Sequence, residues 1–187
     1  MNQQIKTACD VMRRGGIILY PTDTVWGIGC DATNSDAVRK IFDIKHRADS
    51  KAMITLVSGL PMLERYVRCI PDIAYELMEV SMKPITIVYD SATGLAPELL
   101  AQDGSIGIRV TSEEFSNRLC RTYGKPIVST SANVSGQKTP CNFSAISDEI
   151  ITAVDFVVDY ARDVVDCPSP SSVIKISENG TFHILRP

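Results

Sequence analysis

The chain has 187 residues, of which 44% are hydrophobic and 22% are charged, and its formal net charge is -3. This length suits one domain with a buried core, and the composition is that of an ordinary globular protein. The small negative charge excludes a global basic field for nucleic acid, although a local basic cleft is compatible with it.

Signals for secretion, membranes and bound metal are weak. The N-terminus does not resemble a signal peptide, and no apolar run is long enough to span a bilayer. The six cysteines form no C-x-x-C pair and there are only two histidines, so the sequence predicts no metal site held by the protein. We expect a cytoplasmic protein with reduced thiols and no membrane contact.

Helical and strand patterns alternate along the first half of the chain. In order, they predict a helix at Ile5–Arg14, a strand at Ile17–Tyr20, a helix from Asn34 or Ser35 to Lys45, a strand at Met53–Val57, and helices at Met62–Val67 and Ile73–Met82. The segment Pro21–Gly29 (PTDTVWGIG) holds hydroxyls, a carboxylate, the only tryptophan and two glycines. It is therefore more than a connector.

The second half contains more strands. In order, it predicts strands at Ile85–Tyr89 and Ser105–Val110, a helix at Glu113–Tyr123, a strand from Ile127, a short helix at Ser144–Ile151, a strand at Phe156–Val158, and a hairpin of Val173–Ile176 and Phe182–Leu185 around Asn179-Gly180. Because adjacent strands also occur, we expect one α/β domain over residues 1–187 with a mixed sheet.

Three cations follow the second predicted helix within seven residues: Lys45, Arg47 and Lys51. A helix that returns to a sheet edge delivers such residues to a place where ligands commonly bind in α/β proteins. Alternatively, the first two cations only complement the negative end of the helix.

A second polar cluster, Ser129 to Gly136, reads STSANVSG. In an extended chain Ser129, Ser131 and Asn133 share one face and offer neutral donors and acceptors for ribose, phosphate or an amino acid. The alternative is a polar turn with local hydrogen bonds to its own backbone.

Arg109 lies on an apolar strand, and Arg186 lies in the last strand. A buried arginine needs an anionic partner, which is either an acidic residue such as Asp23 or Asp103 or a ligand carboxylate. The sequence has no G-x-S-x-G elbow, no phosphate-binding P-loop and no dinucleotide motif, so any phosphate must be bound by side chains and irregular loops.

The sequence resembles the Sua5/YrdC/YciO family, and the matching segments occur in the order that the family has. They are GGIILYPTDTVWGIGCDA, IFDIKHR, GIRV, KPIVSTSANVSG and a terminal SSVIKI...ILRP. The resemblance implies a YrdC-like domain, in which a twisted mixed sheet flanked by helices surrounds a positively charged cavity. It also implies a threonylcarbamoyl-AMP synthase that converts L-threonine, bicarbonate and ATP, with Mg²⁺, into threonylcarbamoyl-AMP and pyrophosphate. A tRNA-modifying transferase complex would be the partner that uses the product.

The resemblance assigns roles by motif position. Lys45 and Arg47 would be catalytic. The implied ATP-binding residues are Lys45, Arg47, Lys51, Ser105, Ser129, Asn133, Thr139 and Arg186. The implied threonine-binding residues are Thr24, Arg109, Ser131 and Ser171.

Two segments depart from the family pattern, Ser81-Met82-Lys83-Pro84 and the run DYARDVVDCPSP before Ser171. They keep open a YciO-like paralogue with another substrate. A further alternative is an RNA-binding protein of the same fold that uses the basic cavity without turnover.

Overall fold

The computed structural model describes residues 1–46, 53–164 and 169–187. Its α-helices are α1 (Asn2–Arg13), α2 (Ser35–Ile44), α3 (Leu60–Tyr66), α4 (Asp72–Val80), α5 (Glu114–Tyr123) and α6 (Asp148–Ala153). Its strands are β1 (Ile18–Tyr20), β2 (Gly27–Gly29), β3 (Ile54–Val57), β4 (Ile85–Tyr89), β5 (Ile106–Val110), β6 (Ile127–Ser131), β7 (Phe156–Val157), β8 (Ser172–Ile176) and β9 (Phe182–Arg186).

The two best-marked helices begin and end at signals written in the sequence. The side chain of Asn34 accepts a hydrogen bond from the Ala37 amide and starts α2. Glu113 does the same for α5 by accepting from two amides of its first turn, and that helix ends at Gly124 with a φ of 80°. A helix needs such caps because its first amides and last carbonyls have no partner within the helix.

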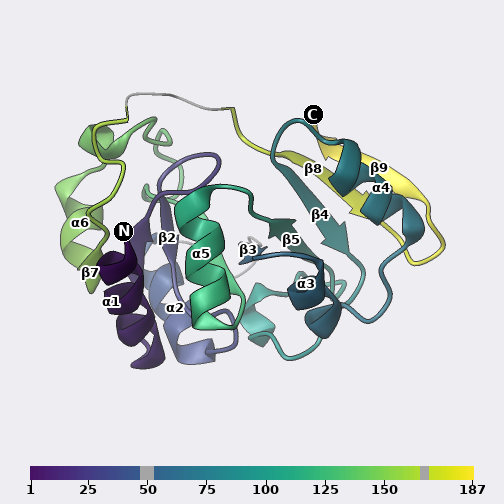
Figure 1. The fold of residues 1–187 in the computed structure, drawn as a ribbon, viewed down its shortest axis with the longest axis horizontal. Coiled ribbons are helices and arrows are strands. Elements are labelled where there is room, and N and C mark those ends of the chain that lie inside the picture. Colours follow the sequence, from purple (N-terminus) through teal and green to yellow (C-terminus); the bar gives the residue numbers. More distant parts are fainter. Residues whose placement is uncertain (47–52, 165–168) are drawn as a thin grey trace.

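The strands form one mixed sheet in the order β7-β1-β2-β6-β3-β5-β4-β8-β9. The pairs β3–β5 and β4–β8 are parallel, whereas β2–β6, β3–β6, β4–β5 and β8–β9 are antiparallel. Strand β6, from late in the sequence, therefore lies between two early strands, and this arrangement joins the two halves of the chain. Figure 1 shows α1, α2 and α6 at one end of the molecule and β4, β8 and β9 at the other.

The two faces of the sheet carry separate apolar cores. Helices α1 and α5 pack with Ile18, Tyr20, Leu56 and Ile127 on one face. Helices α2, α3, α4 and α6 pack on the other face, which includes Leu19 and other apolar strand residues. Side chains alternate along each strand, so Ile18 and Leu19 enter different cores.

Most predicted elements are present, and the predicted single α/β domain with a mixed sheet is confirmed in architecture. Strand β2 was not predicted, because two of its three residues are glycines, which are depleted in strands. The expectation of six reduced thiols is wrong for Cys141, which is disulfide-bonded, while Cys9, Cys30, Cys69 and Cys120 are free thiols. Within the described ranges no helix has the length and apolarity to cross a membrane.

Candidate active site

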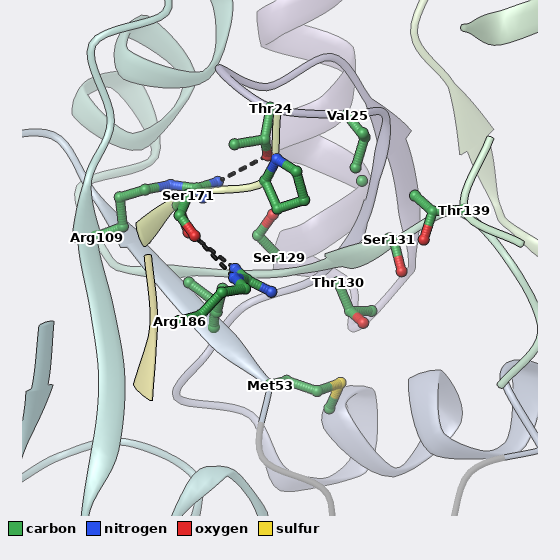
Figure 2. Close-up of a pocket in the computed structure, with 13 residues that line it drawn as sticks. Thr24, Val25, Met53, Arg109, Ser129, Thr130, Ser131, Thr139, Ser171 and Arg186 are labelled. Carbon is green, nitrogen blue, oxygen red and sulfur yellow. Dashed lines mark hydrogen bonds between the residues drawn. The ribbon is translucent and has the colours of Figure 1, made fainter. Parts of the chain in front are cut away.

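A cavity of about 290 Å³ opens on the face of the sheet that α1 and α5 cover elsewhere. The register places Ser131 opposite Gly27, and Ser129 opposite Ile54, on this same face. The described residues that line the cavity are Thr24, Val25, Gly27, Met53, Ile54, Arg109, Ser129, Thr130, Ser131, Thr139, Pro170, Ser171 and Arg186. They come from both halves of the chain (Figure 2).

One wall of the cavity is the loop between β1 and β2. The Thr22 hydroxyl donates to the Val25 carbonyl at 2.7 Å and lies 3.2 Å from the Thr24 hydroxyl. These bonds fold the PTDT segment into a turn that keeps Thr24 buried beside the cavity. Such bonds from a side chain to its own backbone are what threonine favours in turns.

Arg109 projects from β5 into the same region, and its side chain is only 3% exposed. Its Nη2 lies 2.9 Å from Asp23 Oδ1 and donates to Thr24 Oγ1 at 3.4 Å. Burial lowers the pKa of Arg109 and raises the pKa of Asp23, and each charge partly offsets this effect on the other. Of the partners that the sequence left open for this arginine, Asp23 is thus the one beside it in the structure.

Arg186, in the edge strand β9, supplies a second guanidinium. Its Nε donates to the Ser171 carbonyl at 2.9 Å, and its Nη2 donates to the Ser171 hydroxyl at 3.2 Å. That hydroxyl also lies 2.9 Å from Thr86 Oγ1. Figure 2 shows Arg109 and Arg186 on either side of Ser171.

The end of β6 adds the third feature, a row of hydroxyls. Ser129, Thr130, Ser131 and Thr139 all line the cavity, and Figure 2 shows their side chains. Seven predicted site residues therefore meet here: Thr24, Arg109, Ser129, Ser131, Thr139, Ser171 and Arg186. Their contacts with ATP or threonine stay predictions.

Lys45 is not among the lining residues, because its side chain is buried and turned toward the backbone of the polar cluster. Its ammonium donates to the carbonyls of Ser131 and Asn133, the latter at 2.6 Å. In return, the Lys45 carbonyl accepts a hydrogen bond from the Ser135 amide at 2.9 Å. Lys45 thus joins the end of α2 to the chain that follows β6.

Ser105 and Asn133 also lie outside the lining. Ser105 precedes β5 and donates to Asp103 at 2.6 Å, at the opposite end of the strand from Arg109. Four residues of extended chain span about 13 Å, so Ser105 lies well away from Arg109, and its contact with ATP stays a prediction. Asn133 donates to the carbonyls of Val134 and Gln137, and its Oδ1 is buried without a hydrogen-bond partner among the described residues.

Arg47 and Lys51 lie outside the described residues. Five lining residues were not predicted from the sequence, because apolar residues and glycine carry no signal of binding chemistry. They are Val25, Gly27, Met53, Ile54 and Pro170. Their positions beside PTDT, at the start of β3 and before Ser171 are the only hints. No group of three or more potential ligands that could hold a metal occurs in the described part of the chain.

This fold and cavity define an α/β protein that can bind a small anionic ligand through side chains, without a phosphate loop. A family model for Sua5, YciO and YrdC, described as "Telomere recombination", matches residues 10–187. The chain belongs to this family.

Two relatives and two solved structures illustrate the match. A Pseudoalteromonas translucida protein named threonylcarbamoyl-AMP synthase is 34% identical over 94% of both chains. A Methanocaldococcus jannaschii protein named putative threonylcarbamoyl-AMP synthase is 32% identical over 91% of this chain and 79% of its own. E. coli YciO matches with a TM-score of 0.84 and 25% identity, covering 100% of this chain and 89% of its own.

A structure of P. abyssi Sua5 complexed with L-threonine matches with a TM-score of 0.83 and 24% identity, over 94% of this chain. The present chain spans about half the length of that protein, 52%. This likeness shows the shared fold.

Proposed function

We propose that the protein is an L-threonylcarbamoyladenylate synthase, which makes threonylcarbamoyl-AMP and pyrophosphate from L-threonine, bicarbonate and ATP. The observation that carries this proposal is the 34% identity, over 94% of both chains, to a protein named threonylcarbamoyl-AMP synthase. The cavity supports it, because two guanidiniums and a row of hydroxyls suit a carboxylate and a nucleotide together.

The reaction needs no nucleophile from the protein. The amine of threonine attacks carbon dioxide or bicarbonate to give a carbamate, and with bicarbonate a water is lost. A carbamate oxygen then attacks the α-phosphorus of ATP, and the bond to pyrophosphate breaks. The protein has to hold the two substrates in line and stabilise negative charge on the phosphates.

The arrangement of the cavity suggests a division of roles. Arg109 and Thr24, which are bonded to each other, would hold the threonine carboxylate and hydroxyl. Ser131 and Ser171 would lie on the threonine side, whereas Ser129, Thr139 and Arg186 would contact the nucleotide. Mg²⁺ would enter with the ATP phosphates, since the described residues offer no carboxylate cage for it.

The experiment that tests the function is ATP-dependent release of pyrophosphate with bicarbonate, with and without L-threonine. We expect release only when all three substrates are present, and mass spectrometry should find threonylcarbamoyl-AMP. Release that does not depend on threonine would reject the proposal. A tRNA-modifying transferase complex would consume the product, and adding one with tRNA should yield threonylcarbamoyladenosine.

A second candidate is a YciO-like paralogue that activates another amino acid, because Ser81-Met82-Lys83-Pro84 and the run before Ser171 depart from the family pattern and E. coli YciO shares the fold, with a TM-score of 0.84. The same assay with serine and other amino acids separates the two candidates. Direct binding of RNA without turnover would instead appear as a salt-sensitive complex that ATP and threonine leave unchanged.

A further inference from the structure

Asp23 lies directly behind the wall of the cavity. Its Oδ1 is 2.9 Å from Arg109 Nη2, and the side chains are 6% and 3% exposed, respectively. Arg109 lines the cavity, whereas Asp23 does not. A ligand would therefore contact the arginine, and the aspartate would act on it only through that arginine.

A contribution to the free energy of unfolding does not by itself explain a buried ion pair at this place. Removing two charges from water costs several kcal/mol per ion, and a buried ion pair often stabilises a protein no more than apolar residues of similar volume. The pair does favour one direction for Arg109, because it places a buried negative charge 2.9 Å from Nη2; the contact is one of charge, since neither Asp23 oxygen has a hydrogen-bond partner among the described residues.

One end of the arginine is engaged within the protein. Its Nη2 lies beside Asp23 and donates to Thr24, and its Nε is buried without a hydrogen-bond partner among the described residues. Figure 2 shows the guanidinium reaching toward Thr24, with Ser171 and Arg186 on its other side. Because a guanidinium is planar and rigid, fixing Nη2 also fixes the direction of Nη1, which is the nitrogen left for a ligand carboxylate.

The charges at this end of the cavity also match such a ligand. Arg109 and Arg186 are the charged residues among the described lining, and Asp23 is the carboxylate bonded behind them. Two guanidiniums and one carboxylate leave a net positive charge on the protein side, which favours anionic groups of the ligands.

We propose that Asp23 is a positioning residue that holds Arg109 in the orientation needed to bind the α-carboxylate of the amino-acid substrate. This inference deepens the proposed function and rests on it. The PTDT segment would then have two roles, since Thr24 contacts the ligand and Asp23 orients Arg109. Because Asp23 acts through Arg109, its contribution should vanish when the arginine is absent.

The test compares the KM for threonine with the KM for ATP in purified full-length variants. In Asp23→Ala we expect the threonine KM to rise about tenfold or more, because a misplaced contact group weakens binding, while the ATP KM stays within about twofold. In Asp23→Asn, which keeps an oxygen acceptor and the volume, we expect a smaller rise of about threefold. In an Arg109→Met background, Asp23→Ala should change the threonine KM by less than about twofold.

L-Threoninamide gives an independent readout, because it keeps the amine and lacks the carboxylate. The preference of the wild-type protein for threonine over threoninamide should shrink in Asp23→Ala and in Arg109→Met by a similar factor. Asp31→Asn is the matched control: Asp31 is also a buried carboxylate, 7% exposed and 2.9 Å from Lys125, but it lies outside the cavity. It should leave both KM values unchanged.

Three results would overturn the inference: an unchanged or lower threonine KM in the Asp23 variants, an equal rise of both KM values, or an Asp23 effect of the same size with and without Arg109. If Asp23→Ala does not fold, Asp23→Asn decides by the same criteria. Absence of threonine-dependent turnover in the wild-type protein would instead reject the proposed function, so the two failures are distinguishable.

Discussion

Lys45 illustrates how a residue that the sequence predicts to face phosphate can also have a place in the fold itself. Its position after a buried helical stripe predicted a cation at the sheet edge. In the structure its ammonium is buried and satisfies the carbonyls of Ser131 and Asn133. It therefore supports the polar cluster that follows β6, and its predicted contact with ATP stays a prediction.

Substituting Lys45→Met tests this assignment, because methionine keeps the apolar stem and removes the ammonium. We expect the free energy of unfolding to fall by about 1–3 kcal/mol, since two buried carbonyls lose a donor. Pyrophosphate release should fall as well, because Ser131 lines the cavity. Urea denaturation and the release assay measure the two effects.

Lys40→Met is the matched control on the same helix, because Lys40 donates to a single carbonyl, that of Gly15, on the exposed surface. Its stability should stay within about 0.5 kcal/mol of the wild-type value. If Lys45→Met instead lost its activity with no loss of stability, the ammonium would act on the ligand and the role described here would be wrong.

At the scale of elements, β2 is a strand that was not predicted from the sequence. Both of its glycines face the side of the sheet that carries Tyr20 and Ser131. A Cβ at Gly29 would lie 2.4 Å from the Val128 carbonyl oxygen and 2.6 Å from the Tyr20 ring. A Cβ at Gly27 would meet only side-chain atoms, with Ser129 Oγ nearest at 3.2 Å. Gly29 is thus required for packing, whereas Gly27 keeps the cavity open.

Alanine substitutions in β2 should separate these two roles. Gly29→Ala should lower the free energy of unfolding by roughly 2 kcal/mol or more, because backbone must move to relieve the contact. Gly27→Ala should cost less stability and weaken binding in the cavity, since the new methyl group lies against Ser129. Urea denaturation and the KM values for ATP and threonine distinguish the two.

Gly59→Ala serves as the control for the loss of glycine, because its Cβ would have no neighbour nearer than 3.8 Å. Equal destabilisation by all three substitutions would contradict the assignment of separate roles to the two glycines of β2.

For the whole molecule, local patterns in the sequence predicted the order of elements, the mixed sheet and most of the polar site residues. Capping residues and apolar periodicity act over a few positions, so α2 and α5 could be located from sequence. Which residues meet across the sheet could not be located in this way. Arg109 lies beside Asp23 only because β5 and the loop before β2 converge. Ser105 is absent from the cavity lining because it precedes β5, at the end of the strand opposite to Arg109.

Asp31 shows a second long-range junction, one that connects the start of α2 to the end of α5. Its Oδ1 accepts from the amide and hydroxyl of Thr33. Its Oδ2 accepts from the Tyr123 hydroxyl at 2.7 Å and from Lys125 at 2.9 Å. Burial raises the pKa of this carboxyl, but the donors together outweigh burial, so the pKa lies below its usual value.

This shift makes the stability of the whole domain dependent on pH in a definite direction. A carboxyl whose folded pKa is depressed stabilises the protein above the unfolded pKa, about 4, and this contribution is lost as pH falls through the folded pKa. Asp31→Asn should therefore cost about 1–3 kcal/mol at pH 7, where charged acceptors are replaced by a neutral one. The difference from the wild-type protein should shrink steadily below pH 4.

Urea denaturation of both proteins between pH 7 and about 3 measures this difference. Asp10→Asn is the control, because Asp10 pairs with Arg13 on the exposed surface, where such a pair contributes little. A deficit in Asp31→Asn that stayed constant over the whole range would mean that the carboxylate charge is not what joins α2 to α5. In that case shape, and not charge, would hold this junction together.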